Sequence, residues 1–512
     1  MTSYRCGRTP GLEQRRARAP RALAGVILLT YVGAARAAPG EVSLADIVAV
    51  AVRQSPELTR ARIDLDAARA ELQRARAIED TQVGATFRTV AIHTPETDPE
   101  GELEQVDGTL GVSITRRLST GGQLGLSATG ERLHLVGIQR TTTDGQPLES
   151  GVEHRYFAAV SLLFNQPLLR GAGQTAYEAP IRRAARERDA AALNQEARAR
   201  DLVVSLAQAY WQVAFAARQL EVRKTSLDLA QQQLAYTEGA IRAEKVPRSE
   251  ALAVRQAIAT RKQDVIASEQ EIYDRSLALR QLAGLEIGPE ALTVTTEPLP
   301  ERIDAAALDL EGTVRAALDH SPSLAALAAS RHAAEIGVAA ADSAAKPKVD
   351  FDLSAGPTGA DRSPGSALRS GVDRPGYQVD TSLTLQQSLE HSAERGGQAA
   401  ARAGLSTARV AEQEGRARLA MKATRAVQRA ESALANIALG DEAIELARQN
   451  ITAEQRRFEL GKSTNFDVLR RQDELEQARL RHASAVADYL SARADLDGLS
   501  GAILRRYGIV MP

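Results

Sequence analysis

A glycine-rich turn is the first segment of this chain whose residue types could carry chemistry. Gly171-Ala172-Gly173-Gln174-Thr175-Ala176 fits the G-x-G-x-x-A pattern, in which glycines let the backbone approach a pyrophosphate. A dinucleotide site of this kind also needs a strand–helix–strand unit of about 30 residues. The helix predicted after this turn continues without a second parallel strand. We therefore interpret the glycines as a turn that joins a strand to a helix.

The histidines and the cysteine give no metal-ligand spacing. The seven histidines are His93, His134, His154, His320, His332, His391 and His482. No two of them form an H-x₃-H pair, and the one cysteine, Cys6, is remote from all of them. The chain also has no G-x-S-x-G motif, no P-loop and no paired catalytic carboxylates in a plausible setting. These patterns predict no metal, no cofactor and no enzyme activity.

The amino terminus has the organisation of a secretory signal peptide over residues 1–37. An arginine-rich segment precedes the short apolar run Ala22 to Val32, and Ala35-Arg36-Ala37 is a cleavage site of the A-x-A type. Cys6 precedes the apolar run, so it is no lipoprotein acylation site, and the mature chain would hold no cysteine. Cleavage removes seven arginines and one glutamate from a chain of net charge −1. The acidic exported protein that remains is not expected to bind nucleic acid.

One step of 217 residues maps the second half of the chain onto the first. Heptad positions of the first half and their counterparts are Leu220, Leu227, Leu234 and Ile241, then Ile437, Ile444, Ile451 and Phe458. An internal repeat of this kind decides the architecture before any local motif. We expect a first repeat over 38–283, a linker over 284–309 and a second repeat over 310–512.

Each repeat reads as helices, strands and then a long helical hairpin. Ser55-Pro56 and Ser321-Pro322 each predict a helix start, with serine as N-cap and proline in the first turn. Period-two alternation predicts strands within 81–165 and 349–387, and heptads predict helical hairpins over 177–282 and 394–499. The polar and glycine-rich stretches between strands, such as Gly356 to Pro375, are expected to be exposed loops.

The alternating strands of an exported chain are typical of outer-membrane strands, although a small soluble β-subdomain would show the same alternation. Lipid does not tolerate open sheet edges, so several chains must contribute strands to one barrel. The predicted fold class is an α+β membrane protein built from a duplicated unit of a β-strand pair and a very long coiled-coil hairpin. Three copies would form an outer-membrane β-barrel of twelve strands that continues into a periplasmic α-helical barrel.

The two repeats differ in the strand region. From Pro56 to Gln166 the first repeat has 45 more residues than the second has from Pro322 to Gln387. A tight turn at Leu118-Ser119-Thr120-Gly121-Gly122 could join two extra strands, which would give a trimer of 18 strands. We favour the other interpretation, a longer extracellular loop with hairpin character.

The chain resembles the TolC-like outer membrane efflux protein family over essentially its whole mature length. The residues that carry the resemblance are Leu44-Ala45-Asp46-Ile47, Ser55-Pro56-Glu57-Leu58, Gln166-Pro167-Leu168-Leu169, Phe458-Glu459-Leu460-Gly461 and Phe466-Asp467-Val468-Leu469. The resemblance implies a homotrimer, with a 12-stranded barrel in outer-membrane lipid above a long periplasmic tunnel. It further implies an exit duct for drug efflux or type I secretion. Such a duct would dock to a periplasmic adaptor (a membrane fusion protein) and an inner-membrane RND or ABC transporter.

The resemblance also implies roles for residues at the two hairpin tips. The adaptor-contact positions are Lys245, Val246, Phe458, Gly461, Lys462 and Ser463. Asp467 matches the first acid of a ring at the tunnel mouth, and Glu250 is its repeat counterpart. Arg470 stands where the family has a second ring acid, which puts a strongly cation-selective gate in doubt. Asp467 would equally suit a helix cap.

A periplasmic coiled-coil adaptor or structural protein is the alternative function. Adaptors have one helical hairpin flanked by β-domains, whereas this chain is predicted to have two hairpins and duplicated strand pairs. The sequence leaves the transported substrate and the transporter class open.

Overall fold

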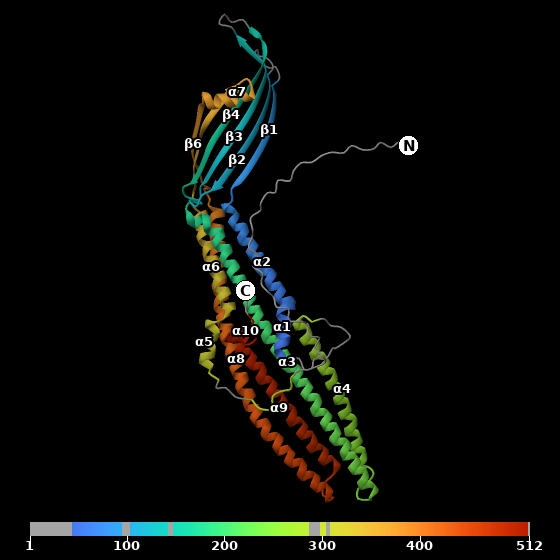
Figure 1. Cartoon of the computed structure of the whole chain (residues 1–512). Helices are drawn as coiled ribbons and strands as arrows, with labels where there is room; N and C mark the ends of the chain where they lie inside the picture. The colour runs from blue at the N-terminus through green and yellow to red at the C-terminus, as the bar shows by residue number, and fades with distance from the viewer. Residues whose placement is uncertain (1–42, 95–102, 142–146, 286–296, 304–307, 510–512) are drawn as a thin grey trace, which may run out of the picture. The chain divides into compact units, whose positions relative to one another are not determined.

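The computed structural model describes residues 43–94, 103–141, 147–285, 297–303 and 308–509. Long helices and a single antiparallel sheet make up the unit that begins at Glu41 (Figure 1). The expected signal peptide, 1–37, and most of the linker between the repeats lie outside the described residues.

Two pairs of short helices repeat as the sequence predicts. The pairs are α1 (Leu44–Gln54) with α2 (Pro56–Arg76), which is followed by the 3₁₀ turn η1 (Ala77–Glu79), and α5 (Leu310–Asp319) with α6 (Pro322–Ala344). The Ser55 hydroxyl accepts from the backbone N–H of Glu57 (3.2 Å), and the Ser321 hydroxyl accepts from that of Leu324 (3.2 Å). Both helices carry proline in the first turn, where its missing N–H costs nothing.

Six strands form one antiparallel sheet in the order β1-β2-β3-β4-β5-β6. They are β1 (Gln82–Thr94), β2 (Leu103–Arg117), β3 (Gln123–Thr141), β4 (Pro147–Pro167), β5 (Lys348–Asp361) and β6 (Gly376–Gln386). The interpretation of the 45 extra residues as a long loop is wrong, because they form the full-length strands β2 and β3. The turn between these strands, around Ser119, lies beside the start of α3, where the N–H of Gly173 donates to the carbonyl of Thr120 (2.8 Å).

The register divides the sheet into an apolar and a polar face. One row of cross-strand neighbours reads Val83, Ile114, Leu126, Leu162, Ala355 and Val379 across the six strands. The adjacent row, on the opposite face, begins Gly84, Ser113, Ser127 and Ser161. Because successive side chains of a strand point to opposite faces, the alternation seen in the sequence becomes a continuous apolar surface on one side.

The helix α7 (Pro364–Asp373) replaces an expected loop between β5 and β6. The Ser363 hydroxyl accepts from the N–H of Ser366 (3.3 Å), and Pro364 opens the helix. The expectation of an exposed loop from Gly356 to Pro375 is therefore wrong. The Ser-Pro signal that marks the starts of α2 and α6 occurs here a third time, at Ser363-Pro364.

The long helices form two hairpins as predicted, each extended by a few residues. They are α3 (Gln174–Arg242) with α4 (Glu250–Ala283), and α8 (Ser392–Glu459) with α9 (Asn465–Leu499), and the short α10 (Ala502–Arg506) follows. At 1.5 Å per residue, a helix as long as α3 measures about 100 Å. Gly171 and Gly173 adopt positive φ at the turn from β4 into α3, which confirms their interpretation as a strand-to-helix turn.

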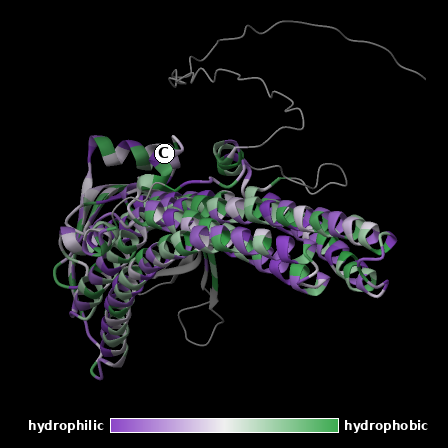
Figure 2. Cartoon of the chain, turned by 90° about the horizontal axis from the view of Figure 1, so that it is seen from below, coloured by the Kyte–Doolittle hydropathy of each residue, from purple (hydrophilic) through white to green (hydrophobic). Residues whose placement is uncertain are grey.

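Apolar and polar positions alternate along these helices instead of gathering into long apolar runs (Figure 2). Within the described ranges, no helix is both long and apolar enough to cross a membrane. The largest core cluster packs α1 against the middle of α3 and the end of α4, with Leu202, Leu206, Tyr210 and Leu279 at its centre. Elsewhere alanines such as Ala430 and Ala492 fill the helix interfaces, so neighbouring backbones lie close together.

Candidate functional site

The turn of the second hairpin is fixed by the backbone conformation of Gly461. This residue has φ +70°, a left-handed conformation that a residue without Cβ adopts at little cost. The N–H of Gly461 donates to the carbonyl of Phe458 (2.9 Å), and that of Lys462 donates to the carbonyl of Arg457 (2.8 Å). These bonds close the end of α8 in the manner of a Schellman motif. The glycine identified from the sequence is thus the residue that reverses the chain.

Asp467 caps the start of the returning helix α9. Its carboxylate accepts from the hydroxyl (2.7 Å) and the backbone N–H (3.2 Å) of Thr464. The N–H of Asp467 donates in return to the Thr464 hydroxyl (3.3 Å), which completes a capping box. The hydrogen bond from the Thr464 side chain lowers the pKa of the Asp467 carboxyl from its ordinary value. The capping role anticipated for Asp467 is confirmed, and its part in a gate stays a prediction.

Glu250 joins the first hairpin to the second at the same helix end. Its carboxylate accepts from the backbone N–H (3.2 Å) and the side-chain amide (3.1 Å) of Asn465. The Asn465 amide oxygen accepts from Gln233 (2.8 Å) and Thr237 (2.9 Å) of α3. Asn465 is fully buried, so one side chain connects α3, α4 and α9. A carboxylate at the start of α9 is further stabilised by the positive end of the helix dipole.

Arg261 forms a second connection between the hairpins, which sequence reasoning missed. Its buried guanidinium donates to the Ser226 carbonyl (2.8 Å), the Gln472 amide oxygen (2.9 Å) and the Asp473 carboxylate (2.7 Å). A comparison of the two repeats could have identified Arg261 from the sequence. The 217-residue step maps Arg261 onto Ala478, so a long cation occupies a seam position where the other hairpin has a small residue.

Arg470, which replaces the second ring acid, is exposed one turn beyond Asp467. Its guanidinium lies 3.5 Å from the Glu474 carboxylate, and Arg471 pairs with the same carboxylate from 2.7 Å. Glu474 is thus flanked by two arginines. The structure brings Glu250 and Asp467 to one helix end, while Arg470 lies on the adjoining surface of α9.

The residues expected at adaptor contacts differ in their exposure at the two tips. Phe458 is only 8% exposed and packs against Tyr236, with ring centroids 5.7 Å apart. The exposed apolar side chains of the second tip are Leu460 (70%) and Phe466 (66%). Lys462 is exposed, and Ser463 hydrogen-bonds to the buried Glu454. At the first tip, Lys245 is exposed and Val246 is half-buried.

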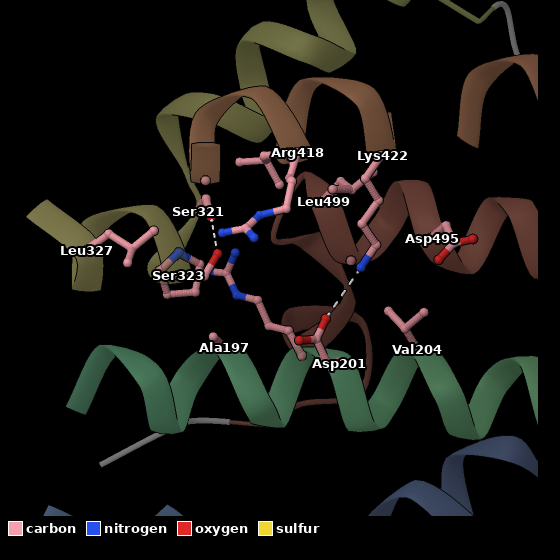
Figure 3. Close-up of a pocket in the computed structure, with 15 residues that line it drawn as sticks. Ala197, Asp201, Val204, Ser321, Ser323, Leu327, Arg418, Lys422, Asp495 and Leu499 are labelled. Atoms are coloured by element: carbon pink, nitrogen blue, oxygen red, sulfur yellow. Dashed lines mark hydrogen bonds and ion pairs between the residues drawn. The ribbon is translucent and has the colours of Figure 1, made fainter. Parts of the chain in front are cut away.

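A hollow of about 310 Å³ lies farther along the helices, between α3, α6, α8 and α9 (Figure 3). Lys422 and Asp201 form an ion pair across it (3.5 Å), and the hydroxyls of Ser321 and Ser323 are 2.9 Å apart at the start of α6. Burial raises the pKa of Asp495 in its wall. The helices that meet here form a junction below the sheet.

The described ranges contain no group of three or more His, Cys, Asp or Glu side chains that could hold a metal ion. The organised polar groups near the tips are instead capping and inter-helix contacts. The inter-helix contacts of Glu250 and Arg261 hold the two helical hairpins together, and the hairpins could separate if these contacts broke.

Residues 313–502 match the family model of outer membrane efflux proteins. The match lies in the second half of the chain and is a likeness to this family over those residues. The matched residues run from α5 to α10 and include the second helical hairpin with its Asn465 and Asp467 contacts. No curated protein sequence matches the chain.

Solved structures of outer-membrane channels share the fold of this chain. The outer-membrane channel OprN superposes with a TM-score of 0.67 at 14% identity, over 90% of this chain and 89% of that one. VceC from Vibrio cholerae gives 0.65 at 16% identity, over 90% and 96%. CmeC from Campylobacter jejuni gives 0.65 at 12% identity, over 90% and 85%. The fold is therefore that of TolC-like outer-membrane channels, as the resemblance implied.

The family match over residues 313–502 and the shared fold agree with the outer-membrane channel that the sequence resemblance implied. The family match and the shared fold favour a channel over the alternative of a periplasmic adaptor.

Proposed function

We propose that this chain is an outer membrane efflux protein and that three copies of it form a passive exit channel in the outer membrane. The observation that carries the proposal is the sheet, whose apolar row crosses all six strands while its other face is polar. A sheet of this kind is stable when its apolar face contacts lipid and its polar face contacts water. The strands β1 and β6 form its two open edges, and lipid does not tolerate open edges. Pairing β6 of one copy with β1 of the next removes them.

The barrel of such a trimer would have 18 strands, because each copy supplies six. The first and last strands run in opposite directions, so neighbouring copies would pair antiparallel like every other pair in the sheet. Barrel diameter grows roughly in proportion to strand number, and barrels of 16–18 strands enclose an aqueous channel. A trimer with 12 strands would require β2 and β3 to leave the sheet that the register gives them.

The contacts between α4 and α9 supply the parts of a periplasmic gate. Glu250 and Arg261 of the first hairpin each bind α9 of the second. The closed mouth would persist while these contacts hold, and it would open when the hairpins of each copy separate. Arg470 in place of an acid adds positive charge near Asp467, so the mouth would select cations less strongly than an all-acidic ring.

The hairpin tips are where a periplasmic adaptor would dock. The exposed Leu460 and Phe466 offer apolar contacts, with Lys245, Gly461 and Lys462 beside them in the two turns. The adaptor would join the channel to an inner-membrane RND or ABC transporter, which supplies the energy for efflux or type I secretion.

Expression in a Gram-negative host tests the channel function. We expect heat-modifiable trimers in the carbonate-resistant outer-membrane fraction, and steps of ionic conductance when they are added to planar lipid bilayers. A soluble periplasmic monomer without conductance would contradict the proposal.

A cysteine at Ser119 tests the strand number. The β2–β3 turn lies on the helix side of the sheet, so Ser119→Cys should react with a membrane-impermeant maleimide only from the periplasm. Gly122 is unsuitable, because a Cβ there would lie 2.6 Å from the Gln166 side-chain oxygen. Labelling of Ser119→Cys on intact cells would exclude 18 strands.

A further inference from the structure

The helix α7 lies against the apolar face of the sheet, at the end remote from the long helices (Figure 1). Gly359 of β5 belongs to that face, since alternation places it with Leu353 and Ala355. A Cβ at Gly359 would lie 2.1 Å from the carbonyl oxygen of Ala367 and 2.5 Å from the nitrogen of Gly371. The close approach of β5 and α7 thus depends on glycine at both positions. A helix on this face stands where lipid would contact the barrel.

Aromatic side chains on the apolar face mark two levels. Phe164 and Phe351 meet edge to face near the long helices, with centroids 6.4 Å apart. Tyr156 and the exposed Tyr377 lie toward the other end of the same face. Eight residues of β4 separate Tyr156 from Phe164, which is about 26 Å along a strand. The spacing of Tyr156 and Phe164 on β4 is close to the height of the apolar band that aromatic residues flank in an outer-membrane barrel, while Tyr377 lies between these two levels.

A groove runs between α7 and the sheet at the outer of these levels. It has a volume of about 560 Å³ and is lined mainly by apolar side chains. The helix contributes Leu368 and Val372, which remain 62% and 76% exposed. Strands β2 to β4 contribute apolar-face residues such as Leu110, Val112 and Val160. Water is a poor occupant of such a surface, because burying apolar area stabilises by about 25 cal/mol per Å².

One arginine lines this groove, and three more lie on or beside α7. Arg132 lines it from β3, directly opposite Tyr156 in the register. Arg362, Arg369 and Arg374 are exposed on α7 and at its two ends. Among the residues that the structure describes, none of the four forms an ion pair. The acids near them are Glu131, which also lines the groove but alternates to the opposite face of β3 from Arg132, Asp361, whose carboxylate accepts from the backbone N–H of Arg362 (2.6 Å), and Asp373 at the end of α7.

We propose that the groove between α7 and the sheet binds an anionic outer-leaflet lipid. One acyl chain would lie along Leu368 and Val372, and its phosphate would meet Arg132 and Arg369. The proposal rests on the barrel of the proposed function, because the apolar face contacts lipid only if the sheet closes with its polar face inward. Arginine suits this role because its planar fork binds phosphate oxygens in pairs.

Fluorescence quenching can measure how deeply α7 lies in the lipid bilayer. Because Cys6 lies in the expected signal peptide, Val372→Cys would give a mature protein with one thiol for a fluorescent label. In vesicles, nitroxides on acyl chains near the head group should quench this label strongly. The matched control, Asp373→Cys, lies next to it on another face of the helix and should be quenched mainly by a water-soluble collisional quencher. Equal accessibility of both positions to the aqueous quencher would overturn the proposal.

Lipid retention tests the phosphate contact. Trimers purified from outer membranes in mild detergent would be assayed for bound phosphorylated glycolipid by native mass spectrometry. Removing one cation near the membrane surface should weaken retention by about fivefold, so Arg132→Gln and Arg369→Gln should each lower it. Arg88→Gln changes an arginine on the polar face and should leave retention unchanged. Enzymatic removal of the lipid phosphate should lower retention by the wild type to the level of the variants.

The outcomes separate this proposal from the proposed function. Trimers that conduct ions and retain lipid equally in all three variants would overturn the lipid site alone. A wild-type protein that forms no membrane trimers would overturn the channel and, with it, the basis of the lipid site. Loss of lipid from Arg88→Gln as well as from Arg132→Gln would show general charge attraction and would also overturn the specific groove.

Discussion

The Arg261 guanidinium of α4 lies 2.7 Å from the Asp473 carboxylate of α9. The arginine side chain is 6% exposed and the aspartate 57%, so the cation is held inside the helix interface while its partner reaches water. The two residues are 212 positions apart. This pair connects the two repeats of the chain directly, close to where both hairpins turn.

Arg261→Met is expected to destabilise the closed arrangement of the hairpins. It leaves the buried Gln472 amide oxygen without its donor, which costs about 1–3 kcal/mol. The melting temperature should fall, and single channels should open more often in planar bilayers. The matched control is Arg255→Met, since Arg255 pairs with Glu238 on the surface within the first hairpin. If both variants gate like the wild type, the α4–α9 contact is not part of a gate.

The cap at Asp467 should make the start of α9 sensitive to acid. The folded protein holds the pKa of this carboxyl below its ordinary 3.8, so the ionised cap stabilises the fold at and above that pH. The stabilisation is lost as the pH falls through the lowered pKa. Amide-exchange protection factors in the first turn of α9 should therefore drop only in strong acid, and Asp467→Asn should lower them at neutral pH.

The start of α6 is the internal control for this measurement. Its cap, Ser321, is a hydroxyl that does not titrate, so protection there should not follow the same acid transition. A parallel loss of protection at both helix starts would indicate general unfolding and contradict a local role for Asp467.

Gly461→Ala should loosen the second tip without a steric clash. No atom lies within 4 Å of the position that its Cβ would take, so the cost comes only from the left-handed backbone, about 1–2 kcal/mol. Limited proteolysis should cut the turn after Gly461 faster in the variant. Gly396→Ala, in the interior of α8 and also with open space around it, should instead be neutral or stabilising. Equal proteolysis of the two variants would contradict the role of the left-handed turn.

Neighbouring residues of β3 distinguish a membrane strand from an extracellular loop. Leu126→Arg places a charge on the apolar face, which costs about 2–4 kcal/mol near the bilayer midplane. Ser127→Arg places the same charge on the polar face and should alter conductance and ion selectivity. We expect trimer yield in outer-membrane fractions to fall for the first variant only. Equal yields with unchanged conductance would mean that β3 does not cross the membrane.

The sequence by itself determined the elements of this protein and its duplication. Heptads define α3, α4, α8 and α9, and serine and threonine caps mark their neighbours and their turns. Period-two alternation identified the strands and their apolar sides. These signals are local, because the regular spacing of apolar residues in a helix or a strand involves only residues that are close in the chain. That is why the hairpins, the Asp467 cap and the turning glycines could be predicted.

Only the tertiary structure decided which segments meet. Alternation in residues 103–141 is the same whether they form a loop hairpin or two full strands of the sheet. The pairing of β2 with β1 and of β3 with β4 shows that they are two full strands. Glu250 and Asn465 lie 215 residues apart, and no local period contains that contact. Phe458 resembles an exposed tip residue in sequence, yet Tyr236 from another helix covers it. Burial, strand pairing and long-range hydrogen bonds depend on how distant segments of the backbone approach one another. The order of residues along one helix or strand does not determine that approach.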